Sequence, residues 1–368
     1  MSELEYTEQG WRMTVDTNRH HRDSRWDYHG EGVYHITLVV ENRYPLFGKL
    51  AGTSPENAHI ELNEFGKKVD KIVRKVPEFY ATKNIWLKTL QVLVMPDHIH
   101  WAIQVLQPMN CSIGEVVRST KSACTSLYKN SYAYPGGNNA AKDNTCDAES
   151  VDFARIFTSR GSIWQYLPAG YHERLLRCRG QLDAMIHYIK DNPRRLWLKR
   201  ANPDLFRIHR QTPIAGIPCT TLGNIFLAEN PLREALHCSR TLTKAEIDQL
   251  KAECLMQAAN GTIFISPAVS EGEKQICRTL REAGYPLIIV LSEGFPKPDS
   301  PHYKYYKPSG VYFEACSAGR LLLIEPDAAL FERKDIETAV YAKTGPIPHE
   351  TKRYRFVAQN AIAELISK

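Results

Sequence analysis

The chain has 368 residues, of which 43% are hydrophobic and 24% are charged. This length favours two hydrophobic cores over one, and the composition is that of a folded globular protein, which excludes a collagenous or wholly disordered chain. The net charge of +6 is only mildly basic, so by itself it points to no class of partner.

The nine cysteines are scattered along the chain without a CxxC pair. Their odd number and irregular spacing favour reduced thiols over a zinc ribbon or a disulfide framework. No apolar run approaches the length of a membrane span, and the polar N-terminal segment is unlike a signal peptide. We therefore expect a cytoplasmic protein that does not enter a membrane.

The first half of the chain begins with a polar segment over residues 1–30, which reads as an arm that precedes the fold. Residues 32–43 mix β-branched and aromatic side chains like a strand, and residues 54–77 read as a helix ended by a proline. Residues 84–106 are too long for one strand and are interrupted at 95–97, which predicts a hairpin.

Apolar residues at helical spacing predict a helix over 112–130, whereas 130–150 is a loop rich in Gly, Asn and Asp. A short aromatic strand within 162–177 follows, and then a helix over 179–193 that we expect to end at its Asn-Pro pair. This order predicts an antiparallel sheet with helices on one face, which is a ferredoxin-like α+β plan.

The pattern changes near residue 210. Short apolar runs at 261–267, 285–295 and 319–326 are bounded by Gly and Pro, and a helix over 271–284 separates the first two. Apolar strands that alternate with helices indicate a parallel sheet covered on both faces. We therefore expect three parts: the arm 1–30, an α+β domain over 31–205, and a second α/β, Rossmann-like domain over 210–368.

Two histidines in the predicted hairpin are candidate metal ligands. Successive side chains of a strand alternate between its faces, so His98 and His100 point the same way while Ile99 faces the core. Two imidazoles side by side can chelate a metal ion. Among thirteen histidines, such a triplet arises by chance in roughly one chain in five, so a pair of surface or capping histidines is the alternative.

A tyrosine and an asparagine share one face of the helix predicted over 179–193. Tyr188 and Asn192 lie at positions i and i+4, so the phenol and the amide are neighbours. If this face packs over the strand that carries the histidines, a nucleophile, an amide oxygen and two imidazoles converge. The alternative is a half-buried aromatic residue followed by a common helix stop.

Residues 151–200 carry ten Lys and Arg against four Asp and Glu, a surplus equal to the whole net charge. Aromatic residues are interleaved with them, as expected where phosphates are neutralised and unpaired bases stack. A solvated basic face over buried aromatic residues is the alternative. The candidate DNA-binding residues are Arg174, Arg177, Arg179, Lys190, Arg194, Arg195, Lys199, Arg200, Trp164 and Trp197, together with Lys121 from the preceding helix.

Three segments resemble the signature blocks of the REP-associated tyrosine transposases, a branch of the single-tyrosine HUH transposases. They are MPDHIHWAI (95–103), IWQYLPAGYHERLLR (163–177) and MIHYIKDNPRRLWL (185–198). The start GVYHIT (32–37) and the order of the blocks also agree. The resemblance covers about residues 30–200; the arm, the loop 131–150 and the second domain depart from the family pattern.

The resemblance implies the HUH fold, with His98 and His100 as metal ligands, Tyr188 as nucleophile and Asn192 completing the metal site. It implies cleavage of single-stranded, hairpin-forming repeat DNA through a 5′-phosphotyrosine. A phenol with a pKa of about 10 is a poor nucleophile at neutral pH and needs a Lewis acid. Two imidazoles and one amide oxygen suit Mg²⁺ or Mn²⁺.

Two rival functions stay open. A domesticated regulator would bind the DNA hairpin without cutting it, and a hydrolytic metal phosphoesterase would use water in place of the tyrosine. All three readings are compatible with association with the nucleoid and with a homodimer.

The second domain weakly resembles the Rossmann-like domains of the DprA and LOG group, and a structural or protein-interaction role is equally compatible. A turn before Ser270 stands where phosphates often bind. Glu271 and Glu273 would oppose an anion at that position.

Overall fold

The computed structural model describes residues 4–7, 10–13, 26–131, 162–165, 171–296 and 310–368. The chain divides into two compact units, Met1–Trp197 and Leu198–Lys368. This division precedes the predicted boundary near residue 210, because Leu198 already packs against the core of the second unit. Most of the loop predicted over 130–150 lies outside the described residues.

The N-terminal unit is built on a four-stranded antiparallel sheet with the order β6-β7-β3-β8. Its strands are β3 (Gly32–Val39), β6 (Leu87–Val94), β7 (His98–Val105) and β8 (His172–Leu175). The first predicted strand and the predicted hairpin are confirmed. In the arm, β1 (Leu4–Thr7) pairs with β2 (Gly10–Met13).

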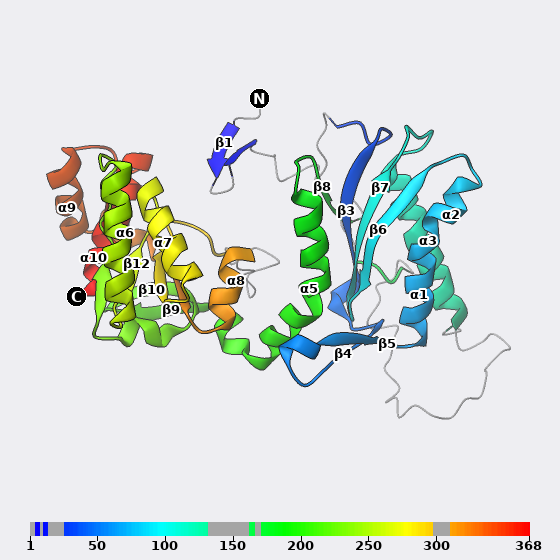
Figure 1. The fold of residues 1–368 in the computed structure, drawn as a ribbon, viewed down its shortest axis with the longest axis horizontal. Helices are drawn as coiled ribbons and strands as arrows, with labels where there is room; N and C mark the ends of the chain where they lie inside the picture. The colour runs from blue at the N-terminus through cyan, green and yellow to red at the C-terminus, as the bar shows by residue number, and fades with distance from the viewer. Residues whose placement is uncertain (1–3, 8–9, 14–25, 132–161, 166–170, 297–309) are drawn as a thin grey trace. The chain divides into compact units, whose positions relative to one another are not determined.

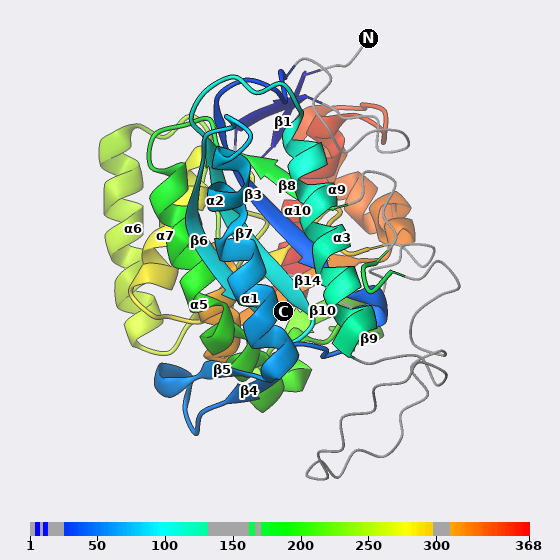
Figure 2. The ribbon, with the colours of Figure 1, turned by 90° about the vertical axis from the view of Figure 1, so that its right-hand side faces the viewer.

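Helices cover both faces of this sheet (Figure 1, Figure 2). On one face lie α1 (Glu64–Arg74), α2 (Val76–Ala81) and α3 (Ile113–Ser131), which bury the main core of the unit. On the other face lies α5 (Gln181–Ala201), which packs Met185 and Ile189 against Ala102. The prediction of helices on one face is therefore wrong in this respect, and α5 is the helix that it misplaced.

The segment predicted as one helix over 54–77 folds differently. Its first part contributes to a hairpin of β4 (Gly48–Ala51) and β5 (His59–Leu62). The helix begins only after Asn63, whose side chain accepts a hydrogen bond from the backbone N–H of Gly66 at 2.7 Å. An N-cap of this kind satisfies a helix N–H that has no partner within the helix.

Gly66 allows α1 to pack closely against the backbone of Phe47, the residue before β4. A Cβ atom at this position would lie 2.0 Å from the carbonyl oxygen of Phe47. We expect Gly66→Ala to lower the free energy of unfolding by about 1–3 kcal/mol, the usual cost of overpacking, as measured by urea denaturation. Gly310→Ala is the control, because a Cβ there would meet nothing within 4 Å. Equal stability of the two variants would contradict the close approach.

Helix α5 continues through the Asn-Pro pair at which the sequence predicted its end. Pro193 has no backbone N–H, so the carbonyl of Ile189 loses its usual donor. The side-chain amide of Asn192 compensates, because its nitrogen donates to the carbonyl oxygens of Tyr188 at 2.7 Å and Ile189 at 3.4 Å. The helix therefore stays continuous past the residues on which the candidate site depends.

The C-terminal unit contains a six-stranded sheet with the order β11-β12-β13-β14-β10-β9. The strands from β11 to β14 are parallel, and β10 is antiparallel to both of its neighbours. The parallel, apolar strands predicted here are confirmed. The six strands are β9 (His209–Ile214), β10 (Ile217–Gly223), β11 (Arg233–Ala235), β12 (Ile263–Ser266), β13 (Leu287–Val290) and β14 (Leu321–Pro326).

Separate hydrophobic cores fill the two faces of this sheet. One core holds α6 (Lys244–Ala259), α7 (Glu271–Glu282) and α8 (Gly310–Ser317), and the other holds α9 (Lys334–Thr344) and α10 (Lys352–Ser367). Among the described strands, the four parallel ones follow one another in chain order. A Rossmann sheet instead reverses its strand order at a central pair of strands. The prediction that the second domain is Rossmann-like therefore gains no support from its strand order.

The N-terminus of α7 is already capped from within the chain. The carboxylate of Glu273 accepts hydrogen bonds from the backbone N–H groups of Val269 at 2.7 Å and Ser270 at 3.1 Å. These donors would otherwise face an anion, so the turn before α7 is not built as a phosphate site.

Among the helices of the described ranges, none combines the length and the apolar composition that a membrane span requires.

Candidate active site

The two predicted metal ligands lie side by side on the sheet face that α5 covers. In the antiparallel register, His98 of β7 is opposite Val39 of β3, and His100 is opposite Thr37. The Nε2 atoms of His98 and His100 are 3.1 Å apart. Two nitrogens bound at right angles to one Mg²⁺ or Mn²⁺ ion, each at about 2.1 Å, would be separated by about 3 Å. The pair therefore has the spacing of a chelate.

Each imidazole is also held at its other nitrogen. The Nδ1 atom of His98 lies 2.5 Å from Oδ1 of Asp97, and the Nδ1 atom of His100 lies 3.0 Å from Nε2 of His35. Metal-binding histidines commonly donate their second N–H to such an acceptor, which fixes the tautomer and the orientation of the ring. Both rings are thus arranged to present Nε2 to a shared point.

Asp97 is anchored by Arg43, which donates a hydrogen bond to its Oδ2 at 3.3 Å. Burial alone would raise the pKa of Asp97, but the hydrogen bond with His98 and the charge of Arg43 outweigh it and lower the pKa. Asp97 is therefore an ionised acceptor for His98 at neutral pH. Arg43 reaches it from a left-handed backbone conformation (φ 56°), which is uncommon for a residue other than glycine.

His35 is a member of this cluster that the sequence analysis missed. It lies on β3, is 8% exposed and stacks on His100 with 5.1 Å between the ring centroids. Burial, together with the charges of Arg174 and His98, lowers its pKa to about 4. A neutral His35 can accept the Nδ1 proton of His100. The signal that could have found it is a histidine inside an otherwise apolar strand.

The contact with His35 predicts a measurable effect on metal affinity. Removing a partner that orients a metal-binding histidine typically costs about 10–100-fold in affinity, so we expect a loss of this size for His35→Phe. His35→Gln keeps an acceptor and should lose less. Calorimetric titration with Mn²⁺ measures the affinities, and melting temperatures check that both variants fold. Wild-type affinity in His35→Phe would contradict the role.

Tyr188 of α5 lies over the same histidines. Its ring centroid is 5.7 Å from that of His100 and 6.5 Å from that of His35, both in edge-to-face arrangements. The guanidinium carbon of Arg195 lies 5.5 Å from the centre of the Tyr188 ring. The structure therefore brings together three residues that the sequence singled out for different reasons: His98, His100 and Tyr188.

Asn192 lies one turn after Tyr188, and its amide nitrogen serves the helix at Pro193, as described above. That Asn192 binds a metal ion stays a prediction, and the ligand atom would be its side-chain oxygen. Within the described ranges, no group of three or more His, Cys, Asp and Glu is arranged to hold a metal ion. A third ligand to the histidine pair would therefore come from an amide, from water or from the substrate.

The predicted DNA-binding residues have different surroundings. Arg174, Arg177, Arg179 and Lys190 are exposed, and β8 places Arg174 opposite His35. Arg194 and Arg195 are less exposed, and both pair with Asp191, at 3.3 Å and 4.0 Å. The half-buried Trp197 ends the first unit, whereas Lys199 and Arg200 belong to the second.

Of these candidates, Trp164 is buried and Lys121 is half-buried. Trp164 is only 3% exposed, and its indole N–H donates to the carbonyl oxygen of Lys121 at 2.9 Å. Trp164 is therefore a core residue in this structure, which corrects its assignment as a surface for base stacking. Burial also lowers the pKa of Lys121 to about 8. Part of the Lys121 population is therefore uncharged near neutral pH, whereas the exposed arginines stay fully protonated.

Comparisons with known proteins do not assign the chain to a family. No family model matches the chain. An uncharacterised protein of Haemophilus influenzae is 25% identical over 189 residues, which cover 49% of this chain and 94% of that protein.

Two solved structures resemble part of the chain. One is a candidate transposase from Deinococcus radiodurans R1, with 13% identity and a TM-score of 0.26 over 47% of this chain and 96% of that one. The other is a REP-associated tyrosine transposase bound to a REP hairpin, with 16% identity and a TM-score of 0.27 over 47% of this chain and 72% of that one. Both TM-scores are low, so neither likeness establishes the function of this chain.

Proposed function

We propose that the N-terminal unit is a metal-dependent nuclease and strand transferase that cuts single-stranded DNA with Tyr188. The observation that carries the proposal is the position of the Tyr188 ring beside two imidazoles whose Nε2 atoms are 3.1 Å apart. The contacts of Asp97 and His35 support it, because they hold both imidazoles in the orientation that a metal site needs.

His98 and His100, with the side-chain oxygen of Asn192, would hold the metal ion, and this donor set suits Mg²⁺ or Mn²⁺. The ion would supply a Lewis acid for the scissile phosphate. Tyr188 attacks the phosphorus through its phenolic oxygen and gives up its proton to water, and the departing 3′ oxygen takes a proton from water. The bond from phosphorus to the 3′ oxygen breaks, which leaves a 3′-hydroxyl on one DNA fragment and a 5′-phosphotyrosine on the other.

The covalent intermediate preserves the energy of the phosphodiester bond, so rejoining to a new 3′-hydroxyl needs no ATP. Arg195 contributes by its place over the Tyr188 ring. A cation there orients the ring and offsets negative charge as the proton leaves. We propose hairpin-forming repeat DNA as the substrate, in line with the resemblance of the three sequence blocks.

The test is to incubate the full chain and Mn²⁺ with a single-stranded hairpin DNA labelled at its 3′ end. We expect a labelled protein–DNA adduct on a denaturing gel and a tryptic peptide that carries the label on Tyr188. Nicking without an adduct would favour a hydrolytic phosphoesterase. Binding without nicking would favour a regulator that recognises the hairpin.

The exposed basic residues predict a change in salt dependence. Each phosphate contact that is lost from a single-stranded complex makes the slope of log K against log salt less negative by about 0.7. We expect Arg179→Ala combined with Lys190→Ala to weaken binding to all sequences and to flatten this slope, as measured by fluorescence anisotropy. Lys68→Ala with Lys71→Ala is the control, because these exposed residues lie on α1, which packs on the opposite sheet face. An unchanged slope would mean that Arg179 and Lys190 only face solvent.

A further inference from the structure

Arg43 lies beside the histidine pair, at the start of β7. It belongs to the short turn Glu41–Arg43 directly after β3, and its side chain is 44% exposed. The backbone N–H of Val40, just before this turn, donates to the carbonyl oxygen of Asp97 at 2.9 Å. The turn is thereby tied to the strand that carries the histidines, and it holds an exposed positive charge next to them.

The contact between Arg43 and Asp97 leaves part of the guanidinium unused. A strong arginine–carboxylate pair is bidentate, with distances of about 2.7–2.9 Å between nitrogen and oxygen. Here Nη1 alone donates to Oδ2 of Asp97, at 3.3 Å, and the same atom lies 3.4 Å from Nδ1 of His98. Within the described ranges, Nε and Nη2 of Arg43 have no hydrogen-bond partner. These two donors form one side of the guanidinium fork, which matches the spacing of two phosphate oxygens.

The backbone at this position favours glycine over arginine. Asn42 and Arg43 have left-handed φ angles of 54° and 56°. This conformation costs free energy in a residue with a Cβ, and Asn tolerates it better than Arg does. The loop is fixed in this form at its far end too, because the N–H of Phe47 donates to the carbonyl oxygen of Pro96 at 3.0 Å. Such strain tends to persist at functional sites, which supports a role for the Arg43 side chain.

Tyr188 and Arg43 lie at different ends of the histidine cluster. The Tyr188 ring packs beside His100 and His35, whereas Arg43 lies beside His98. On β3, His35 precedes the residue opposite His98 by four positions, which is about 13 Å along the strand. In an in-line displacement, the leaving oxygen departs on the side of the phosphorus opposite to the nucleophile. The fragment that keeps the 3′-hydroxyl therefore extends away from Tyr188, toward Arg43.

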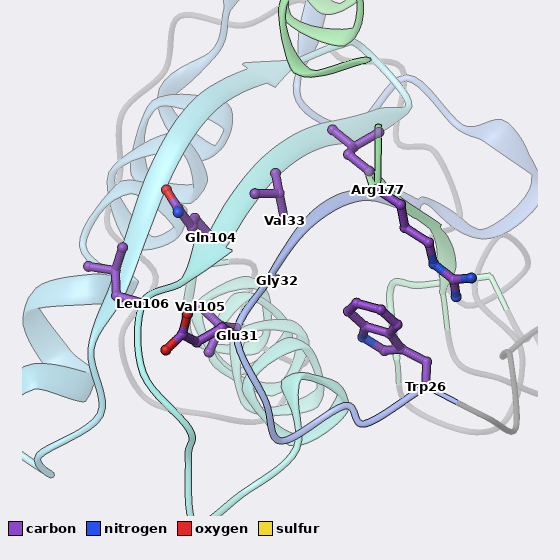
Figure 3. Close-up of a pocket in the computed structure, with 9 residues that line it drawn as sticks. Trp26, Glu31, Gly32, Val33, Gln104, Val105, Leu106 and Arg177 are labelled. Atoms are coloured by element: carbon purple, nitrogen blue, oxygen red, sulfur yellow. The ribbon is translucent and has the colours of Figure 1, made fainter. Parts of the chain in front are cut away.

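The other end of the sheet is less suited to a phosphate. A cavity of about 430 Å³ opens there, around the start of β3 and the end of β7, and the exposed Glu31 lines it (Figure 3). The arginine of this cavity, Arg177, lies over the indole of Trp26, with 4.7 Å from the guanidinium carbon to the ring centre. The carboxylate of Asp97, at the Arg43 end, is already hydrogen-bonded. The charges therefore favour a path of the DNA backbone past Arg43 over one through this cavity.

We propose that Arg43 binds the backbone phosphate immediately 5′ to the one that Tyr188 attacks. Nε and Nη2 donate to two oxygens of that phosphate, while Nη1 keeps its contact with Asp97. Such a contact carries no sequence information; it fixes the register of the strand, so that the scissile phosphate lies at the histidine pair. The inference rests on the proposed function, because it takes Tyr188 as the nucleophile.

The test is a double-mutant cycle between Arg43 and the charge of single phosphates. A DNA hairpin with a single-stranded flank carries one methylphosphonate, which has no charge, at each linkage of the flank in turn. Fluorescence anisotropy in EDTA measures the affinity without metal or cleavage, and the adduct formed in Mn²⁺ maps the cleavage site. We expect the neutral linkage 5′ to that site to weaken wild-type binding by about 5–20-fold, the scale of a partly exposed charge pair with hydrogen bonds. In Arg43→Ala the same linkage should have almost no effect.

Arg43→Gly is a second variant, because glycine adopts this φ without strain and leaves the form of the loop unchanged. It should lose the effect as Arg43→Ala does. Arg118→Ala is the matched control, since Arg118 is an exposed arginine of α3, which packs on the opposite sheet face. It should respond to the neutral linkage as the wild-type protein does.

An equal response of Arg43→Ala and the wild-type protein at every linkage would overturn the role of Arg43. Coupling at a linkage other than the one 5′ to the cleavage site would overturn its assigned position. A protein that binds no single-stranded DNA would overturn the proposed function as well. Coupling at one linkage without any covalent adduct would uphold the phosphate contact and reject the cleavage.

Discussion

Replacing Tyr188 by Phe is expected to eliminate both nicking and the covalent protein–DNA adduct. Loss of an enzyme nucleophile commonly lowers the rate by about 10⁴-fold or more. The change removes one oxygen and keeps the ring that packs against His100 and Arg195. Folding and DNA binding should therefore stay close to those of the wild-type protein. Denaturing gels with labelled hairpin DNA and anisotropy titrations give the two readouts.

Tyr171→Phe is the control for this variant, because Tyr171 lies in a neighbouring sequence block but is only 4% exposed and belongs to the core. It should still nick and form the adduct. An adduct in Tyr188→Phe would assign the nucleophile to another tyrosine. Nicking by Tyr188→Phe without any adduct would assign the attack to water.

Replacing His98 or His100 by Ala is expected to lower Mn²⁺-dependent cleavage by at least about 10²–10³-fold, the scale on which single groups that stabilise transition-state charge contribute. Each variant leaves one imidazole of a pair whose Nε2 atoms are 3.1 Å apart, so the chelate is lost. DNA binding should largely persist, because the exposed basic residues are different side chains. Mn²⁺ titration calorimetry and cleavage rates measure the two effects separately.

His59→Ala serves as the control for the histidine variants, since the His59 side chain is 60% exposed on β5 and pairs with Glu61. It should retain both metal affinity and cleavage. Equal cleavage by the wild-type protein in EDTA and in Mn²⁺ would show that the two imidazoles do not work through a metal ion.

Local patterns predicted those parts of the site that depend on one element. The alternation of His98, Ile99 and His100 was enough to place the two imidazoles on one side of β7, because strand geometry determines it. The i, i+4 spacing likewise related Tyr188 to Asn192. His35 could not be found in this way, since its contact with His100 depends on how β3 pairs with β7, and pairing register is a tertiary property.

The errors in the fold also have physical causes. Propensity rules end a helix before proline, but α5 continues because the Asn192 side chain satisfies the carbonyl that Pro193 leaves without its usual donor. In the second unit, continuous apolar runs revealed buried strands. They carried no information on the order of those strands, because that order arises from contacts far apart in the chain.

Helix α5 begins in the first unit and ends in the second, since the division falls between Trp197 and Leu198. Tyr188 lies on the part of α5 that belongs to the first unit, whereas Leu198, near the end of the helix, packs against the core of the second unit. Because one continuous helix crosses the boundary, a fragment that ends at Trp197 would lack the last turn of α5.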